Sequence, residues 1–338
     1  MDRAGSRSGG GMIISRTPLR VSLFGGGSDL PAFYRRHGGA VLSTTIDKSV
    51  YVTVSRKFDD AVRVSYSRTE EVSRAQDVEH PLVREALALL DIQGGVEITS
   101  VADIPARGTG LGSSSAFTVG LLNALHAYHG RHAPADQLAK EACLIELERC
   151  GEPIGKQDQY AAAFGGLNLI RFHADETVDV TKVICPPDAL GELQRRLLFF
   201  YTGTTRSASA LLAEQSAKLA SEESALSDTR ELTCFAEAAF KALCSGNIEP
   251  LGAMLHQAWR LKRGLASGIS NEAIDLAYDA ALAAGAEGGK LLGAGGGGFL
   301  MFLAPPERHD AVRAALGGLR ETPFAFASHG SKIIFVHE

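Results

Sequence analysis

A loop of glycine and small polar residues that runs into a helix is the feature that most constrains this chain. Residues 108–115 read GTGLGSSS, and apolar residues at near four-residue spacing follow in 116–130, which predicts an amphipathic helix. The loop is therefore expected at a helix N-terminus, where free backbone N–H groups and the helix dipole attract anions. Glycine permits close backbone approach, and serine hydroxyls can donate to phosphate or bind Mg²⁺. The alternative is a serine-capped helix after a flexible turn.

A second glycine-rich segment, 293–298, reads GAGGGG and matches the GxGxxG pattern of dinucleotide-binding folds. That pattern requires a helix next, but residues 299–303 read FLMFL, which predicts a strand. A dehydrogenase is therefore disfavoured. We expect backbone that approaches a ligand or another loop, with a plain glycine hairpin as the alternative.

The order of strands and helices along the chain is irregular, which predicts an α+β fold rather than a doubly wound sheet. A chain of 338 residues suits two lobes, and a proline-containing stretch near 185–191 suggests the boundary. We therefore expect an N-terminal, ATP-binding domain over 12–188 and a C-terminal domain over 189–338. Residues 1–11, which are rich in Gly, Ser and Arg, are expected to be a disordered extension.

Three local patterns complete the expected N-terminal domain. Residues 12–24 are predicted to form two short strands broken near Pro18, because proline cannot donate to a sheet. Residues 40–58 alternate β-branched and polar side chains, which predicts long antiparallel strands. Residues 135–150 are predicted to form a second helix.

Charge and composition narrow the classes of partner and compartment. The chain carries 34 Lys and Arg against 39 Asp and Glu, a net charge of −5, and has no basic run, so nucleic acid is not expected as its main partner. The sequence contains no apolar run of about 18 residues, so no membrane span is predicted. Five scattered cysteines without a CxxC pair argue against zinc and a disulfide framework, and fit a reducing cytoplasm.

Two carboxylates and a cation have the residue types that phosphoryl transfer needs, which are positioning groups and charge neutralisation. Asp158 would orient an acceptor hydroxyl and accept its proton late in the transfer, and a neighbouring Lys or Arg would keep it ionised. Each residue also has an ordinary reading when taken alone. Glu146 reads as a solvated helix residue, Asp158 as a helix cap, and Arg20 as a surface residue on an edge strand.

Three segments taken together resemble the GHMP kinases, which include galactokinase, homoserine kinase, mevalonate kinase and phosphomevalonate kinase. The segments are PLRVSLFGGGSD at 18–29, GLGSSSA at 110–116 and KLLGAGGGG at 290–298. Their order and spacing match the family over residues 12–337. The resemblance implies an ATP- and Mg²⁺-dependent kinase of a small molecule. It also implies a two-lobed fold, with an N-terminal lobe like ribosomal protein S5 domain 2 and a ferredoxin-like C-terminal lobe.

The resemblance also implies residue roles. Asp158 matches the catalytic aspartate, and Arg20 matches the arginine that stabilises the transferring phosphoryl group and holds the aspartate ionised. Mg²⁺ would be bound by Glu146 and Ser114, with Ser115 as an alternative to Ser114. The ATP phosphates would lie on Gly108, Thr109, Gly110, Leu111, Gly112, Ser113, Ser114 and Ser115. The acceptor would be bound by Gly26, Gly27, Ser28, Asp29, Gly155, Gln157, Gly203, Arg206, Gly295, Gly296 and Gly297.

One departure concerns the acceptor. Galactokinases carry an acidic residue and a histidine where this chain has Gly26 and Gly27. Two hydroxyl-binding side chains are therefore missing, which argues against galactose and predicts an opened pocket floor.

Within the family, several phrases are most similar to those of the heptose 7-phosphate kinases, which phosphorylate the anomeric hydroxyl to give the 1,7-bisphosphate on the route to nucleotide-activated heptose. The phrases are FGGGSDLPAFY, IPARGTGLGSSSAFTVGLLNAL, GEPIGKQDQYAAAFGGLN and KLLGAGGGGF. Such an acceptor needs a second phosphate site. Residues 201–206 and Lys262 with Arg263 are the candidates, and surface cations are the alternative reading.

Rival functions remain open. The first is a fucokinase-like or other sugar-1-kinase that acts on a free sugar. The second is an ATP-consuming decarboxylase of the same superfamily, and the third is a non-catalytic regulator that binds a sugar or nucleotide. The oligomeric state does not follow from the sequence.

Overall fold

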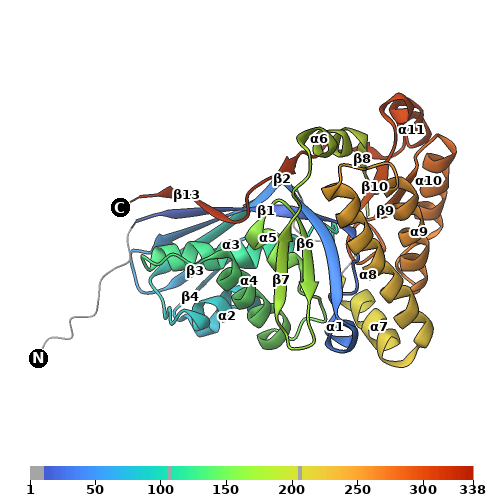
Figure 1. Ribbon diagram of the computed structural model, residues 1–338. Coiled ribbons are helices and arrows are strands. Elements are labelled where there is room, and N and C mark those ends of the chain that lie inside the picture. The colour runs from blue at the N-terminus through green and yellow to red at the C-terminus, as the bar shows by residue number, and fades with distance from the viewer. Residues whose placement is uncertain (1–10, 105–107, 205–207, 338) are drawn as a thin grey trace, which may run out of the picture.

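The computed structural model describes residues 11–104, 108–204 and 208–337, and these residues form two β-sheets with helices packed against them (Figure 1). The large sheet has nine strands, of which β13–β1–β2–β5–β3–β4 run side by side. Strands β6 and β12 also pair with β2, and β7 pairs with β6. Its strands are β1 Ile13–Phe24, β2 Gly39–Arg56, β3 Val62–Ser65, β4 Thr69–Val72, β5 Val96–Ala102, β6 Leu167–Phe172, β7 Val178–Lys182, β12 Phe326–Ala327 and β13 Lys332–Val336.

The small sheet has four strands in the order β11–β8–β10–β9. These are β8 Leu197–Tyr201, β9 Gly288–Leu291, β10 Phe299–Leu303 and β11 Arg320–Glu321. In both sheets the described pairs are antiparallel, with β3 and β5 as the parallel exception. The mixture of sheets and helices confirms the predicted α+β class.

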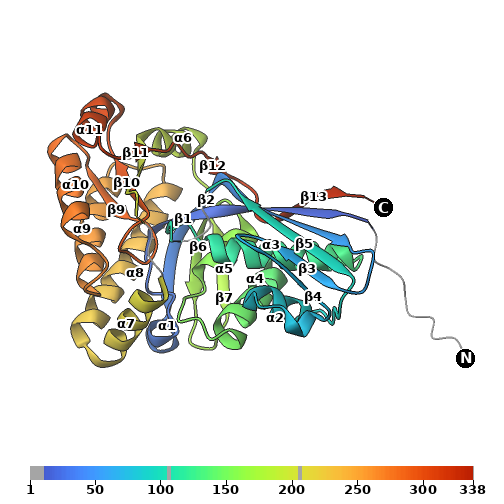
Figure 2. The ribbon, with the colours of Figure 1, turned by 180° about the vertical axis from the view of Figure 1, so that it is seen from behind.

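Helices of the N-terminal half cover the large sheet, and those of the C-terminal half lie around the small sheet and against the neighbouring end of the large sheet (Figure 2). The helices are α1 Pro31–His37, α2 Pro81–Leu89, α3 Ser113–Tyr128, α4 Ala135–Cys143, α5 Gln157–Phe164, α6 Pro187–Arg196, α7 Ala208–Ser221, α8 Glu223–Cys244, α9 Leu251–Gly264, α10 Glu272–Ala283 and α11 His309–Ala315. A π-helical turn, Leu144–Arg149, continues α4. Short 3₁₀ turns lie at Ala75–Asp77 and Pro306–Arg308. Among the described residues, no helix combines the length and the apolar character that a membrane crossing requires.

Strand β1 differs from its prediction. The expected break near Pro18 is wrong, because β1 is one continuous strand of 12 residues. Its register against β2 shifts between Pro18 and Arg20. Such an irregularity in the pairing lets a strand accommodate a residue that cannot donate to the ladder. The strand therefore runs unbroken into the glycine loop that follows Phe24.

The chain returns to the large sheet at its C-terminal end. Strand β13 pairs with β1 over Ile13–Arg16, and β12 pairs with β2. The division of the sequence at residue 188 stays a prediction, but the last strands beyond the small sheet add to the sheet in which the described chain begins. The predicted disordered extension falls on residues 1–10, which lie outside the described residues, and on Gly11.

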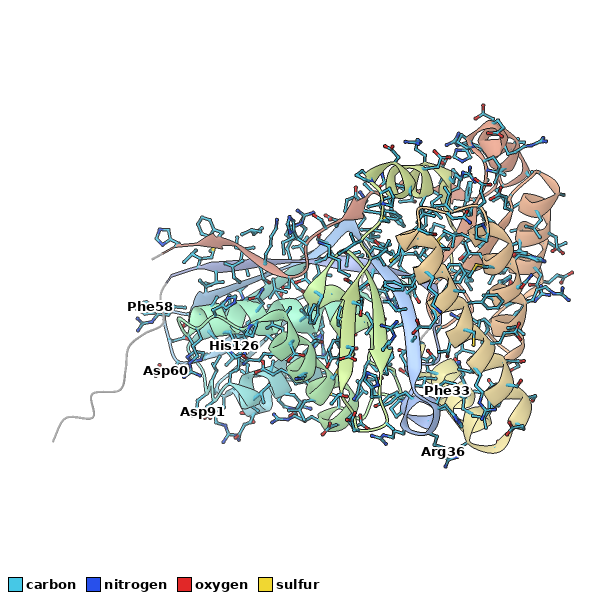
Figure 3. The ribbon with its side chains drawn as sticks, in the orientation of Figure 1. Phe33, Arg36, Phe58, Asp60, Asp91 and His126 are labelled. Carbon is cyan, nitrogen blue, oxygen red and sulfur yellow. The ribbon has the colours of Figure 1, made fainter. Side chains whose placement is uncertain are left out.

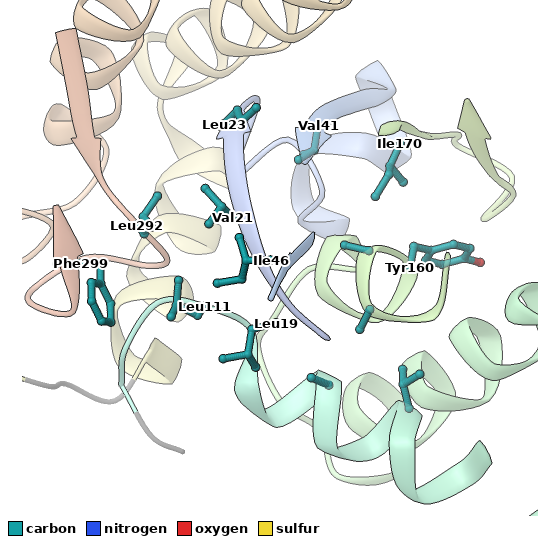
Figure 4. Packing of buried hydrophobic residues seen from close by; sticks show 14 of the residues in the cluster. Leu19, Val21, Leu23, Val41, Ile46, Leu111, Tyr160, Ile170, Leu292 and Phe299 are labelled. Atoms are coloured by element: carbon teal, nitrogen blue, oxygen red, sulfur yellow. The ribbon is translucent and has the colours of Figure 1, made fainter. Parts of the chain in front are cut away.

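Apolar side chains join the two sheets at the place where the two glycine-rich loops meet. Leu111, from the first loop, lies between Leu19 of β1 and Leu292, which precedes the second loop (Figure 4). All three are fully buried. Elsewhere on the large sheet, α1 turns Phe33 inward and leaves Arg36 exposed beside α7 (Figure 3). Helix α1 and helix α7 thus flank residues 25–30, a loop that is called the acceptor loop below because the sequence predicts that it binds the acceptor.

Candidate active site

The loop predicted to bind phosphate ends where α3 begins, at Ser113. Gly110 and Gly112 adopt left-handed backbone angles, with φ of 77° and 73°, which favour glycine. Thr109 and Ser113 are buried, whereas Ser114 is exposed at the start of the helix. The described part of the loop therefore presents the first turn of a helix, with its unpaired N–H groups, on an accessible face.

The second glycine loop packs directly against the first. A Cβ on Gly293 would lie 2.4 Å from Cα of Gly110, and a Cβ on Gly298 would lie 2.5 Å from the carbonyl oxygen of Thr109. Strand β10 follows this loop, so the GxGxxG match is not a dinucleotide site. The expectation that its backbone approaches another loop is confirmed.

Arg20 and Asp158 form a two-pronged ion pair beside the phosphate loop. Arg20 donates from Nε to Oδ1 and from Nη2 to Oδ2 of Asp158, both at 2.7 Å, and from Nη1 to the carbonyl oxygen of Gly110 at 2.6 Å. The Arg20 side chain is buried, while 23% of the Asp158 side chain is exposed. Asp158 lies in the first turn of α5, where the helix dipole favours a negative charge. The structure thus brings together the predicted cation, the predicted aspartate and the loop.

Glu146 lies in the π-helical turn and is buried, so its reading as a solvated helix residue is wrong. Its carboxylate accepts hydrogen bonds from Ser115 Oγ at 2.7 Å, Thr118 Oγ1 at 3.0 Å and Gln159 Nε2 at 2.5 Å. Burial raises the pKa of Glu146 to about 7, against the lowering effect of these hydrogen bonds.

The oxygen atoms around Glu146 suit Mg²⁺, which is usually held by one or two carboxylates together with substrate phosphates. Ser114 Oγ lies 3.3 Å from Glu146 Oε1, and Ser114 is exposed to solvent. Ser115 is buried and donates to the same carboxylate. Within the described residues, no group of three or more His, Cys, Asp and Glu could hold a metal by itself. A bound Mg²⁺ would therefore need nucleotide phosphates to complete its ligands.

Asp29 is the buried centre of the acceptor loop. It accepts hydrogen bonds from the backbone N–H of Gly27 at 3.0 Å and from Nε2 of Gln157 at 2.9 Å. A Cβ on Gly155 would lie 1.9 Å from the Asp29 carboxylate, so this position requires glycine. Burial, reinforced by the charge of Asp158, raises the pKa of Asp29. The hydroxyl of Ser28 instead donates to the backbone carbonyl oxygens of Gly25 and Ala40 and so stabilises the loop itself.

The prediction of an opened pocket floor is wrong at Gly27. The side-chain amide of Gln215, from α7, occupies that space, and its Nε2 would lie 2.4 Å from a Cβ at Gly27. Near Gly26 the closest groups are Ser22 Oγ, Gln157 Nε2 and Lys262 Nζ, which would lie 3.3, 3.8 and 3.9 Å from a Cβ at that position. Sequence reasoning missed Gln215, because a glutamine on a helix some 190 residues away along the chain gives no local signal.

The remaining predicted acceptor residues are more dispersed. Gly295 and Gly296 pack on Ile269, and Gly297 packs on Thr204. Gly203 is exposed, with no atom within 4 Å of a Cβ placed on it. Arg206 lies outside the described residues.

Lys262 and Arg263, the two adjacent basic candidates for a second phosphate site, lie in different surroundings. Arg263 Nη1 pairs with Asp275 at 3.1 Å on a partly exposed face of α9. Lys262 is buried, and its Nζ donates to the carbonyl oxygen of Gly293 at 2.5 Å. Of the pair, Lys262 is therefore the one that the structure brings to the glycine loops.

Comparisons with known proteins show which proteins this chain is similar to. Residues 65–166 match the family model of the GHMP kinases N terminal domain, and residues 239–319 match that of the GHMP kinases C terminal domain; together they cover more than half of the chain. D-glycero-alpha-D-manno-heptose 7-phosphate kinase of Campylobacter jejuni is 29% identical over 95% of this chain and 98% of its own length.

Two further proteins are similar over most of this chain. The crystal structure of a D-glycero-D-manno-heptose 1-phosphate kinase from Bacteroides thetaiotaomicron superposes with a TM-score of 0.79, at 25% identity, over 96% of this chain and 100% of its own. The bifunctional fucokinase/GDP-fucose pyrophosphorylase of Arabidopsis thaliana is 26% identical over 85% of this chain, which spans 29% of that longer protein.

Proposed function

The chain belongs to the GHMP kinases, and from that premise we propose that it transfers the γ-phosphoryl group of ATP to the anomeric hydroxyl of D-glycero-D-manno-heptose 7-phosphate. One observation carries the assignment of the reacting groups. The Arg20–Asp158 ion pair packs against Gly112, which precedes α3, and Asp158 directly follows Gln157, which donates to Asp29 of the acceptor loop. A phosphoryl donor on one side and a hydroxyl on the other would meet at this pair.

The proposed mechanism rests mainly on positioning and charge. Asp158 would hold the acceptor hydroxyl in line and take its proton as the new O–P bond forms. Arg20 would keep Asp158 ionised and stabilise negative charge on the transferring group. Helix α3 would bind the phosphates through its first N–H groups. Mg²⁺, held by Glu146 and Ser114, would neutralise charge on the phosphate oxygens.

The nature of the acceptor rests on similarity. The relative from C. jejuni, which matches along its whole length, is named for the 7-phosphate, and the structural neighbour from B. thetaiotaomicron is named for the 1-phosphate. The first name describes an acceptor that carries its phosphate at position 7, and the second describes one that carries it at position 1. The proposal follows the 7-phosphate, which gives a 1,7-bisphosphate that a later nucleotide-transferring reaction could use. The similarity to the plant fucokinase keeps a free-sugar 1-kinase as the second candidate.

The test is ADP release with Mg·ATP over heptose 7-phosphate, heptose 1-phosphate, free heptose, L-fucose and galactose. We expect turnover on the 7-phosphate. Turnover confined to the 1-phosphate would reverse the direction of the proposal, and turnover confined to a free sugar would favour the second candidate.

Asp158→Asn is measured beside the parent protein on the same panel. Loss of the proton acceptor should lower kcat by about 100- to 10,000-fold, while ATP binding, followed by calorimetry, stays within about threefold of the parent because Asp158 faces the acceptor. An Asp158→Asn variant that keeps the parent kcat would refute the role given to this residue.

A further inference from the structure

Two side chains from the C-terminal half of the chain lie over the part of the acceptor loop that has no side chains of its own. Gln215 of α7 lies over Gly27, and Lys262 of α9 lies near Gly26. Gln215 is 3% exposed and Lys262 is 8% exposed. The two helices thus place a carboxamide and an ammonium at adjacent positions of one loop.

Both side chains keep hydrogen-bond donors without a partner. The ammonium of Lys262 has three N–H donors, and among the described residues it uses one, toward the carbonyl oxygen of Gly293. Nε2 of Gln215 has no partner among the described residues. Buried donors are normally satisfied, because an unmade hydrogen bond leaves the desolvation of the group uncompensated. These donors are suited to oxygen atoms that a ligand brings.

Unpaired atoms nearby indicate the chemistry of that ligand. Ser22 Oγ and Gln157 Oε1 are also buried without a partner in the described structure. Gln157 Oε1 can only accept a hydrogen bond, whereas Gln215 Nε2 and Lys262 Nζ can only donate. A hydroxyl group can satisfy both kinds of partner. A ligand with several hydroxyl groups therefore fits the set better than a purely anionic or an apolar one.

The charge of Lys262 depends on the groups that face it. Burial, the main influence, and the charge of Arg20 lower the pKa of Lys262 to about 8, against the raising effect of Asp29 and Asp158. Lys290 of β9 lies nearby, and burial, followed by the charges of Lys262 and Arg20, lowers its own pKa well below the usual value. It donates to the carbonyl oxygens of Ser22 and Leu23 and so serves the fold. Lys262 is therefore protonated at neutral pH and loses its charge as the pH rises through about 8.

We infer that Lys262 and Gln215 bind the acceptor, and that they donate hydrogen bonds to its oxygen atoms from the C-terminal half of the chain in place of the side chains that Gly26 and Gly27 lack. This inference rests on the proposed kinase function and assigns its acceptor specificity to α7 and α9. The oxygen atom that meets Lys262 belongs either to a hydroxyl group or to the phosphate of the acceptor.

The test compares Lys262→Met with Arg260→Met, which removes the same charge from an exposed position on the same helix. Initial rates are measured with the best acceptor of the panel, whichever it is. Loss of a charge-assisted hydrogen bond should lower kcat/KM for the acceptor by about 10- to 100-fold in Lys262→Met, with KM for ATP unchanged. Arg260→Met should match the parent.

The pH profile separates a binding role from a structural one. In the parent, kcat/KM for the acceptor should fall as the pH rises through about 8, because only the protonated Lys262 donates to the ligand. Lys262→Met should lack this alkaline limb. Gln215→Leu is the second variant. If Lys262→Met does not melt cooperatively and is therefore misfolded, the inference is tested with Gln215→Leu alone.

Acceptor analogues identify the contacts. Gln215→Leu should lose rate with the full acceptor but not with the one deoxy analogue that lacks its hydroxyl partner. For Lys262→Met, a loss of kcat/KM that vanishes with the dephosphorylated acceptor assigns the contact of Lys262 to the phosphate. A loss that vanishes with a deoxy analogue assigns the contact to a hydroxyl.

A rise in KM for ATP with an unchanged acceptor KM would overturn the inference and make Lys262 a support for the Gly293 loop. Turnover on an unexpected acceptor would revise the proposed function but leave this comparison valid.

Discussion

Gly112 is the residue at which the phosphate loop packs against the Arg20–Asp158 ion pair. Its φ of 73° is left-handed, and a Cβ there would lie 3.1 Å from Cγ of Arg20 and 3.2 Å from Oδ2 of Asp158. The residue that precedes α3 therefore leaves just enough room for the ion pair. Any side chain at Gly112 would have to displace either the arginine or the aspartate.

Replacing Gly112 by alanine should harm both stability and activity. A left-handed alanine costs about 1–2 kcal/mol of unfolding free energy. Displacement of Arg20 and Asp158, the pair proposed to act in catalysis, should lower kcat by about 100-fold. The matched control is Gly130→Ala, at the other end of the same helix, where φ is 68° and no atom lies within 4 Å of the added Cβ. Urea unfolding should show similar losses for both, and only Gly112→Ala should lose activity. Equal activity in the two variants would contradict the tight packing.

The residues of the candidate site that could be named from the sequence are those that lie in recognisable family motifs. Arg20, Asp158 and Glu146 were named from the resemblance to the family, and the structure brings the first two into contact. The burial of Glu146 was not predictable from its neighbours, because the donors around it come from α3 and α5. Gln215 was missed for the same reason: its contact with Gly27 joins distant segments and leaves no periodic signal.

At the scale of secondary-structure elements, the β6–β7 hairpin ties together both sides of the acceptor site. Glu176, in its turn, accepts hydrogen bonds from Tyr34 Oη at 2.7 Å and Arg35 Nε at 2.6 Å, and it also pairs with Lys156. Tyr34 and Arg35 belong to α1, which follows the acceptor loop, and Lys156 immediately precedes α5. One carboxylate thus connects the helices that position Asp29 and Asp158.

Glu176→Gln should weaken this connection in a pH-dependent way. Hydrogen bonds from Lys156, Tyr34 and Arg35 outweigh burial and lower the pKa of Glu176 to about 2. Because the folded pKa lies below the unfolded value, the stabilisation is present above about pH 4.5 and is lost as the pH falls through about 2. The side chain is 43% exposed, so solvent screening limits the effect to about 1 kcal/mol.

Thermal unfolding of the parent and of Glu176→Gln, measured from pH 7 down to pH 3, tests this. The gap between the two melting temperatures should be largest at neutral pH and narrow toward pH 3. Glu223→Gln, which breaks an exposed pair with Arg230, should show almost no gap at any pH. A gap for Glu176→Gln that widens in acid would contradict the sign of the shift.

Elements with a strong local pattern were predicted well, and those shaped by their neighbours were not. Helix α3 and strand β10 appear where hydrophobic spacing and glycine loops place them. Strand β1 was predicted to break at Pro18, because the sequence does not reveal that pairing with β2 continues through a shift of register. The π-helical turn that carries Glu146 leaves no recognisable residue signature, since it reads as more of the same helix.

At the scale of the whole molecule, the described chain begins and ends in the same place. Strands β1 and β13 pair side by side, and the backbone N–H of His337 donates to the carbonyl oxygen of Met12 at 2.8 Å. The N-terminal and C-terminal segments together complete one edge of the large sheet.

A circular permutant should therefore fold. Residues 12–337 are joined end to end by about four glycine and serine residues, and new ends are opened between Arg131 and His132, which are exposed between α3 and α4. We expect the parent activity and a melting temperature within about 5 °C, a change of at most about 1–2 kcal/mol. The control lacks residues 332–338, and should melt lower because β1 loses a neighbour. A permutant less stable than this truncated control would contradict the adjacency of the ends.

The return of the chain to the large sheet has a mechanical consequence. The polypeptide crosses between the two sheets twice, once through α6 and once between β11 and β12. Both crossings lie at the end of the molecule opposite to α1 and α7 (Figures 1 and 2). Two connections at one end of the molecule favour a rotation about a single axis, and the displacement is then largest at the opposite end. Helix α1 meets helix α7 at the end of the molecule far from both connections, so a separation there would part Gln215 from Gly27 and open a path to the acceptor loop.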